Sequence, residues 1–255
     1  MTTSITVAET PLVVFCLRRA DDALVLGHRL SEWAGKAPML EEDLALSNIA
    51  LDLIGQARAL YQYAGELTDQ TEDALAYLRD ERAYRNLLLV EQPNGDFAHT
   101  ITRQFLYTAY ADPFWRAMTR SADATLAAIA GKAEKETAYH LRHAGAWLVR
   151  LGDGTAESNH RALSALRRLW PFTGEIFARD AMDEEMIAAG IAVDPETLRP
   201  IWNRTLDDIL SRATLPRPTD GWMQSGGRDG RHSEHLGFLL AELQFLARSH
   251  PKATW

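Results

Sequence analysis

Cysteine, basic charge and long apolar runs are all scarce in this sequence. Its 255 residues include one cysteine, Cys16, so no disulfide can form within the chain, as is typical of proteins in a reducing cytoplasm. No uninterrupted apolar run is long enough to cross a bilayer. The short apolar run at 11–17 has no basic region before it, as a secretory signal would. We therefore expect a cytoplasmic protein without a membrane partner.

Negative charge prevails over positive charge. The chain has 27 lysines and arginines against 35 aspartates and glutamates, a net charge of −8, and no lysine- or arginine-rich block. This balance argues against nucleic acid as a partner. Hydrophobic residues make up 46% of the chain, which excludes disorder, and the length allows a substantial core. We expect one domain over residues 1–255.

Alternating patterns typical of strands are absent, and apolar residues recur instead at three- and four-residue steps. This spacing predicts helices over 17–34, 40–67, 71–91, 97 onward with an interruption near Pro113, 122–151, 156–179 with a bend near Pro171, 195–214 and 233–249. Asp96 and Asp194 are the predicted N-caps of two of them. The expected fold is all-α, a helical bundle with additional C-terminal helices.

The predicted helix at 40–67 is the centre of this pattern. Its apolar positions form two rows, Leu46, Ile49, Leu53, Ala57, Leu60 and Ala64 in one and Leu44, Leu51, Ile54 and Tyr61 in the other. Because they cover most of the circumference, we expect other helices to surround it. Asn48, Asp52 and Gln56 form a polar row at four-residue steps. A solvated or interfacial stripe is the more ordinary interpretation of that row, and a functional one stays open.

Histidines are the next residues with chemical potential. His140 lies on the apolar side of the predicted 122–151 helix, where a hydrogen-bonded core residue is more common than a metal ligand. Glu136 precedes it by four residues, which is not the Glu-x-x-His spacing of carboxylate-bridged metal sites. His232 and His235 have workable metal spacing but exposed polar surroundings.

The loops and possible nucleophiles match no known functional motif. The glycine-rich loop at 225–230 follows no predicted strand and matches no phosphate-loop pattern, so we expect a mobile loop. The chain has no Gly-x-Ser-x-Gly elbow and no reactive-cysteine signature.

Longer stretches carry a family resemblance. They read ALVLGHRLSEWAGKAPMLEEDLALSNIALDLIGQAR, RDERAYRNLLLVEQPNGDFAHTI, KETAYHLRHAGAWLVRLGDGT, GIAVDPETLR and RHSEHLGFLLAELQ, of which VEQPNGDFA and SEHLGFLLAELQ are the most diagnostic. With these the chain resembles the ferritin-like, non-catalytic C subunits of bacterial phenylacetyl-CoA epoxidases, which act in phenylacetate degradation. The resemblance spans residues 23 to 244 and implies a ferritin-like helical domain.

The resemblance also implies where a related catalytic subunit holds its di-iron centre. Six positions of this chain match that subunit's ligands, namely Glu32, Leu53, Gln56, Thr108, Thr137 and His140. Only the first carboxylate and the last imidazole are retained. A bridged di-iron site needs about four carboxylates and two imidazoles. We therefore expect no catalytic, cofactor-binding or metal-binding residue in this chain, and a metal-free polar remnant inside the bundle whose members hydrogen-bond to each other or to water.

Two functions follow as alternatives. In the first, favoured by the missing ligands, the chain is a structural subunit of a multicomponent, NADPH-dependent monooxygenase and stabilises a catalytic di-iron paralogue. In the second it is an independent ferritin-like, metal-dependent oxygenase with an atypical site. The resemblance implies a catalytic partner that holds the di-iron centre and a reductase partner that holds FAD and an iron–sulfur cluster, with no cofactor in this chain.

Overall fold

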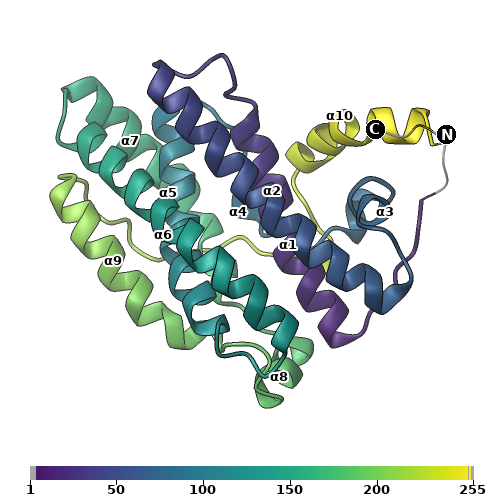
Figure 1. The fold of residues 1–255 in the computed structure, drawn as a ribbon. Helices are drawn as coiled ribbons and strands as arrows, with labels where there is room; N and C mark the ends of the chain where they lie inside the picture. The colour runs from purple at the N-terminus through teal and green to yellow at the C-terminus, as the bar shows by residue number, and fades with distance from the viewer. Residues whose placement is uncertain (1–3, 252, 254–255) are drawn as a thin grey trace.

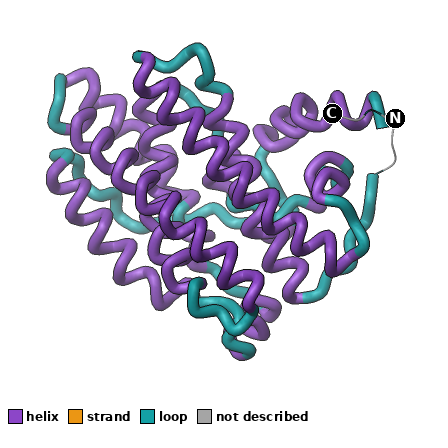
Figure 2. The backbone as a smooth tube through the Cα atoms, viewed as in Figure 1, coloured by secondary structure: helices purple, strands orange, loops and turns teal. Residues whose placement is uncertain are grey.

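The computed structural model describes residues 4–251 and 253. All regular structure in this part of the chain is helical, which confirms the all-α prediction (Figure 2). The α-helices are α1 (Pro11–Ser31), α2 (Leu40–Thr68), α3 (Glu72–Tyr77), α4 (Leu88–Glu91), α5 (Phe97–Met118), α6 (Ala124–Gly152), α7 (Ala156–Leu169), α8 (Ala181–Ala188), α9 (Arg199–Arg212) and α10 (Glu234–Ser249). No described helix is long and apolar enough to span a membrane.

Four long helices form the bundle (Figure 1). Helices α1 and α2 pack along their lengths, as do α5 and α6, and α2 meets α6 between the two pairs. At Gly27 the first pair approaches closely, because a Cβ there would lie 3.2 Å from the Ala50 carbonyl oxygen and 3.3 Å from the Leu53 Cβ. Helices α7 and α9 flank α5 and α6, while α3 and α10 lie beside the α1–α2 pair.

Helix α1 begins six residues before the predicted start. The Thr10 hydroxyl accepts a hydrogen bond from the backbone N–H of Val13 at 3.4 Å, and Pro11 occupies the first helical position, where its missing N–H costs nothing. The predicted caps elsewhere are confirmed. Asp96 accepts from the His99 N–H at 2.9 Å at the start of α5. Asp194 accepts from the Glu196 N–H at 3.0 Å, and it caps the 3₁₀ turn Pro195–Leu198 that leads into α9.

The prediction of a single helix over 71–91 is wrong. The chain instead forms the short α3, a 3₁₀ turn at Glu81–Ala83 and the short α4. Two buried carboxylates of α1 accept hydrogen bonds from the backbone between these pieces. Asp21 accepts from the Arg85 N–H and Asp22 from the Leu87 N–H, both at 2.7 Å. Local apolar spacing does not reveal such distant acceptors.

Proline positions also differ from expectation. Pro113 lies inside an unbroken α5, because the helix is buried on nearly every side from Thr100 to Trp115 and this packing outweighs the lost N–H. The predicted 156–179 helix ends at Leu169, and 3₁₀ turns carry the chain through Pro171. The unpredicted α8 follows, with a capping box formed by Asp180 and Asp183.

Helix α2 is not surrounded as expected. Its first apolar row is buried, but Leu44 of the second row is 58% exposed and Leu51 is 66% exposed. Leu40, at the start of the helix, is 71% exposed. One side of α2 therefore exposes three leucines.

The Asp21–Arg79 ion pair generates a testable prediction. Both side chains are almost completely buried, and the Tyr61 hydroxyl also donates a hydrogen bond to Asp21 at 2.5 Å. Asp21→Asn leaves the Arg79 charge without its counter-charge in the core, so the free energy of unfolding should fall by about 3–5 kcal/mol. Urea unfolding at pH 7 measures this fall.

The control variant is Arg58→Ala. Arg58 pairs with Glu72 at 2.7 Å, but its side chain is 66% exposed, so its loss should barely change the unfolding free energy. Equal stability of the Asp21→Asn and Arg58→Ala proteins would contradict a structural role for the buried pair.

Candidate functional site

The centre of the bundle is where the six matched positions should meet. Leu53 has no exposed surface and packs against Gly27 of α1. Thr108 of α5 and Thr137 of α6 are also fully buried. Each threonine hydroxyl donates to a carbonyl of its own helix, Thr108 to Gln104 at 2.7 Å and Thr137 to Ala133 at 2.9 Å. These positions therefore serve packing and local helix geometry.

Glu32 is not inside the bundle as expected. It follows the last residue of α1, and its side chain is 44% exposed. The carboxylate accepts from the Arg29 guanidinium at 2.9 Å and from the Asn94 amide at 2.9 Å. Gly27, which faces Leu53, lies five residues earlier, more than one helical turn away. Glu32 thus ties α1 to the turn before α5.

The two remaining positions, Gln56 and His140, lie where α2 meets α6. The Gln56 amide donates to Glu136 at 2.9 Å, and His140 Nε2 lies 3.0 Å from the Asp52 carboxylate. The six positions do not hydrogen-bond to one another. Each polar member has a partner elsewhere.

The polar row of α2 contributes side chains to the contact between α2 and α6. Asn48 is exposed, but Asp52 and Gln56 face α6, which agrees with an interfacial stripe. One further contact of this kind was not predicted, between His143 Nε2 and the Glu42 carboxylate at 2.8 Å. The only signal for it in the sequence is the three-residue step from His140 to His143.

These side chains do not fit a di-iron centre. The retained carboxylate is at the bundle's edge, the retained imidazole already binds Asp52, and the threonine hydroxyls donate to carbonyls. A hydrocarbon side chain at position 53 offers no ligand atom. Residues 4–251 and 253 contain no group of three or more histidine, cysteine, aspartate or glutamate residues arranged to hold a metal ion.

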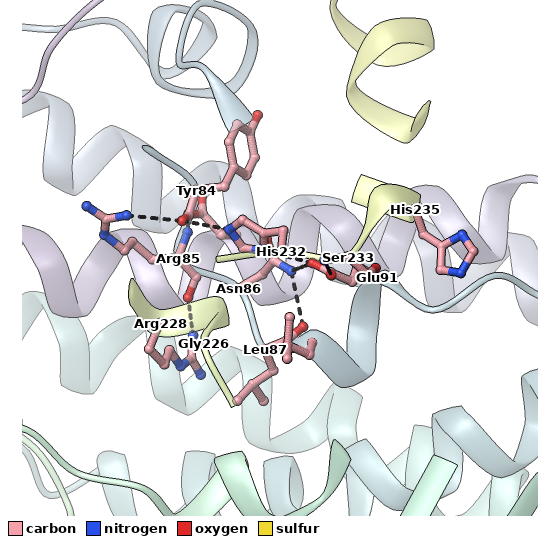
Figure 3. A network of polar contacts seen from close by, with 12 residues as sticks. Tyr84, Arg85, Asn86, Leu87, Glu91, Gly226, Arg228, His232, Ser233 and His235 are labelled. Carbon is pink, nitrogen blue, oxygen red and sulfur yellow. Dashed lines mark hydrogen bonds and ion pairs between the residues drawn. The ribbon is translucent and has the colours of Figure 1, made fainter. Parts of the chain in front are cut away.

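A second polar cluster joins the two most diagnostic stretches (Figure 3). Glu91 is fully buried at the end of α4. Its carboxylate accepts from the Ser233 N–H at 2.7 Å and the Asn86 amide at 2.9 Å, and lies 2.8 Å from His232 Nδ1. The other ring nitrogen of His232 is 3.0 Å from the Tyr84 carbonyl oxygen. The start of α10 is therefore bound to the segment before α4.

Protonation of His232 stabilises this cluster. Both ring nitrogens face acceptors, so both donate only in the imidazolium form. Burial lowers the pKa of His232, but the hydrogen bond and the charge of Glu91 outweigh it, and the pKa lies above its ordinary value. The stabilisation is therefore complete below the ordinary histidine pKa and is lost as pH rises through the raised one. No ring nitrogen of His232 is left for a metal shared with His235, whose ring lies apart in Figure 3.

The glycine-rich loop is anchored rather than mobile. Glu175 accepts from the Gly226 N–H at 2.9 Å and the Arg228 N–H at 3.3 Å, so the amides that a phosphate would need are already used. The Arg228 guanidinium binds the buried Asp22 at 2.7 Å. Gly226 has φ +138°, a conformation that only glycine adopts without strain.

Comparison with known proteins fits this geometry. The family model described as "Phenylacetic acid catabolic protein" matches residues 1–255. The chain belongs to this family. It is also 49% identical, over 245 residues, to the C subunit of the 1,2-phenylacetyl-CoA epoxidase of Escherichia coli (strain K12), covering 96% of this chain and 99% of the relative. The resemblance found from sequence motifs is confirmed, and the bundle is ferritin-like.

Family membership puts the two clusters in context. The diagnostic stretches VEQPNGDFA and SEHLGFLLAELQ form the Glu91 cluster and place α10 against the bundle. Of the matched ligand positions, Glu32 lies beside this region, since Arg29 donates both to its carboxylate and to the Glu91 carbonyl oxygen, and the other five lie along α2, α5 and α6. Within the diagnostic stretches, Glu91 and Ser233 thus join the chain near α4 to the start of α10.

Leu53→Glu tests whether position 53 lies in a closed core. Burying a carboxyl group there should lower the free energy of unfolding by about 2–5 kcal/mol. A buried acid has a raised pKa, so the unfolded state releases its proton first as pH rises, and the loss should be larger at pH 7 than at pH 5. Thermal melts at both pH values, with and without iron(II), measure it.

Leu51→Glu is the matched control, because Leu51 is on the same helix but 66% exposed. Its melting temperature should stay close to that of the wild type at both pH values. Rescue of the Leu53→Glu protein by iron(II), or wild-type stability without iron, would show that position 53 is open to solvent or to metal.

Proposed function

We propose that this chain is the structural, non-catalytic subunit of a multicomponent phenylacetyl-CoA 1,2-epoxidase. In that role it binds and stabilises a catalytic di-iron paralogue in the cytoplasm, while a reductase with FAD and an iron–sulfur cluster supplies electrons to the complex. The observation that carries the proposal is the filled bundle centre, where Leu53 packs on Gly27. The E. coli relative's name, a subunit of this epoxidase, supports it.

The surface supports a role in an assembly. Leu40, Leu44 and Leu51 are exposed along one side of α2. Extended apolar surface on a folded chain is typical of proteins that bind other proteins. A structural subunit needs such surface, whereas an independent oxygenase needs a ligand set that the bundle centre does not offer.

The first prediction from this function concerns iron. Four of six ligand positions hold leucine, glutamine or threonine, so the purified chain should contain well under one iron per chain after growth in iron-supplemented medium. Elemental analysis gives the ratio. Near-stoichiometric iron with the spectrum of a carboxylate-bridged centre would favour the independent oxygenase.

The second prediction concerns assembly. Co-expressed with the catalytic paralogue, this chain should co-purify with it through an interface above ~2,000 Å² in total, as obligate complexes have. The catalytic paralogue alone should be poorly soluble or inactive, and adding this chain should restore epoxidation of phenylacetyl-CoA. A catalytic paralogue that is stable and fully active without this chain would refute the structural role.

A further inference from the structure

Helix α10 is apolar on two opposite sides. Leu236, Leu239 and Leu240 are buried against the rest of the protein, while Phe238 and Phe245 on the other side are each 67% exposed. A phenylalanine side chain offers about 150–250 Å², so the two rings expose roughly 200–330 Å². A helix that is apolar all round is normally covered on every side. We therefore expect another surface to cover the outward face of α10.

Two negative charges lie beside the two rings. Glu234 and Glu242 lie on the outward face of α10, both exposed, and neither forms a hydrogen bond or ion pair with the described residues. They are eight residues apart, about 12 Å along the helix. Phe238 lies midway between them in the sequence. A surface that covers this face needs an apolar floor and basic edges.

A groove of that kind lies between α6 and α9 of the same chain. Its volume is about 470 Å³. Leu141, Gly145 and Ile209 contribute its floor, where Gly145 leaves room for the Ile209 side chain, because a Cβ there would lie 3.3 Å from Ile209 Cδ1. The exposed Asp208 also lines the groove, between Arg204 and Arg212 in the sequence. Its exposed basic residues are Arg142, Arg204 and Arg212. Arg204 and Arg212 are eight residues apart on α9, which is the same spacing as the two glutamates on α10.

We propose that the outward face of α10 in one copy of this chain docks into the α6–α9 groove of a second copy. Phe238 and Phe245 enter the groove, while Glu234 and Glu242 pair with Arg204 and Arg212. Within the described residues Arg204 has no ion-pair partner. Arg212 pairs only with the exposed Asp208, at 3.2 Å, and an exposed pair of this kind is exchanged at little cost.

The two surfaces lie on different sides of the molecule. In Figure 1, α10 is beside the α1–α2 pair at the upper right and α9 is at the lower left, so α10 cannot enter its own groove. The contact joins two unlike surfaces, and each copy offers both of them. A lipid surface is a poorer cover, because the glutamates of α10 and a net charge of −8 oppose binding to anionic membranes.

Sedimentation velocity of the purified chain over a range of concentrations tests the proposal. The wild type should associate as concentration rises. Phe238→Ser with Phe245→Ser should weaken association at least about 30-fold, as expected for loss of central aromatic anchors. Leu51→Ser on α2 is the control, since it also removes an exposed apolar side chain and should leave association unchanged. Circular dichroism melts check that each variant is folded.

A charge exchange makes the test specific. Glu234→Arg with Glu242→Arg places like charges in the contact, as does Arg204→Glu with Arg212→Glu, so each double variant alone should be monomeric. Mixed in equal amounts, the two should associate again, because the arginines of one now face the glutamates of the other. This recovery cannot come from a folding defect.

Four outcomes would overturn the proposal. The first is a wild type that stays monomeric at the highest soluble concentration, and the second is self-association that survives the loss of both phenylalanines. The third is the absence of recovery in the mixture. The fourth is a monomeric wild type whose α10 phenylalanines bind phosphatidylcholine–phosphatidylserine vesicles instead. None of these outcomes bears on co-purification with the catalytic paralogue, so the proposed function is tested separately.

Discussion

Two adjacent buried carboxylates on α1, Asp21 and Asp22, hold together the parts of this protein that are not a regular bundle. Asp21 pairs with Arg79, and Asp22 with Arg228. Both also accept backbone N–H groups from the irregular chain between α3 and α4. Buried charges are costly unless they are paired and hydrogen-bonded. Here both conditions hold, so the carboxylates fix the path of segments that local helical preference would not place.

The Glu91 cluster extends the same principle to the C-terminal part of the chain. Glu91 binds the Ser233 backbone and His232, and the Arg29 guanidinium donates to the carbonyl oxygens of both Glu91 and His235. At the far end of α10, the Gln244 amide donates to the Arg79 carbonyl oxygen at 3.0 Å. Polar contacts at both ends thus orient α10 while its outward face stays apolar.

The bundle centre shows how a ferritin-like fold can exist without the ligands of a di-iron site. Leu53, at a position that the resemblance matches to a ligand of the catalytic subunit, is a buried hydrocarbon, and the polar side chains bind neighbours within the protein, as His140 binds Asp52. The polar contacts between α2 and α6 join the two helix pairs. The function proposed for the chain then rests on its surfaces, where α2 exposes Leu40, Leu44 and Leu51.

The sequence by itself determined the all-α class, most long helices, the caps at Asp96 and Asp194, and the family, because apolar periodicity, capping residues and family motifs are local signals. Tertiary structure decided the rest. It broke the helix predicted over 71–91, where Asp21 and Asp22 offer distant acceptors, and kept α5 intact through Pro113 by burying it. It also placed Glu32 outside the core and left one side of α2 exposed. Each of these depends on which helix lies opposite, and a single stretch of sequence does not contain that information.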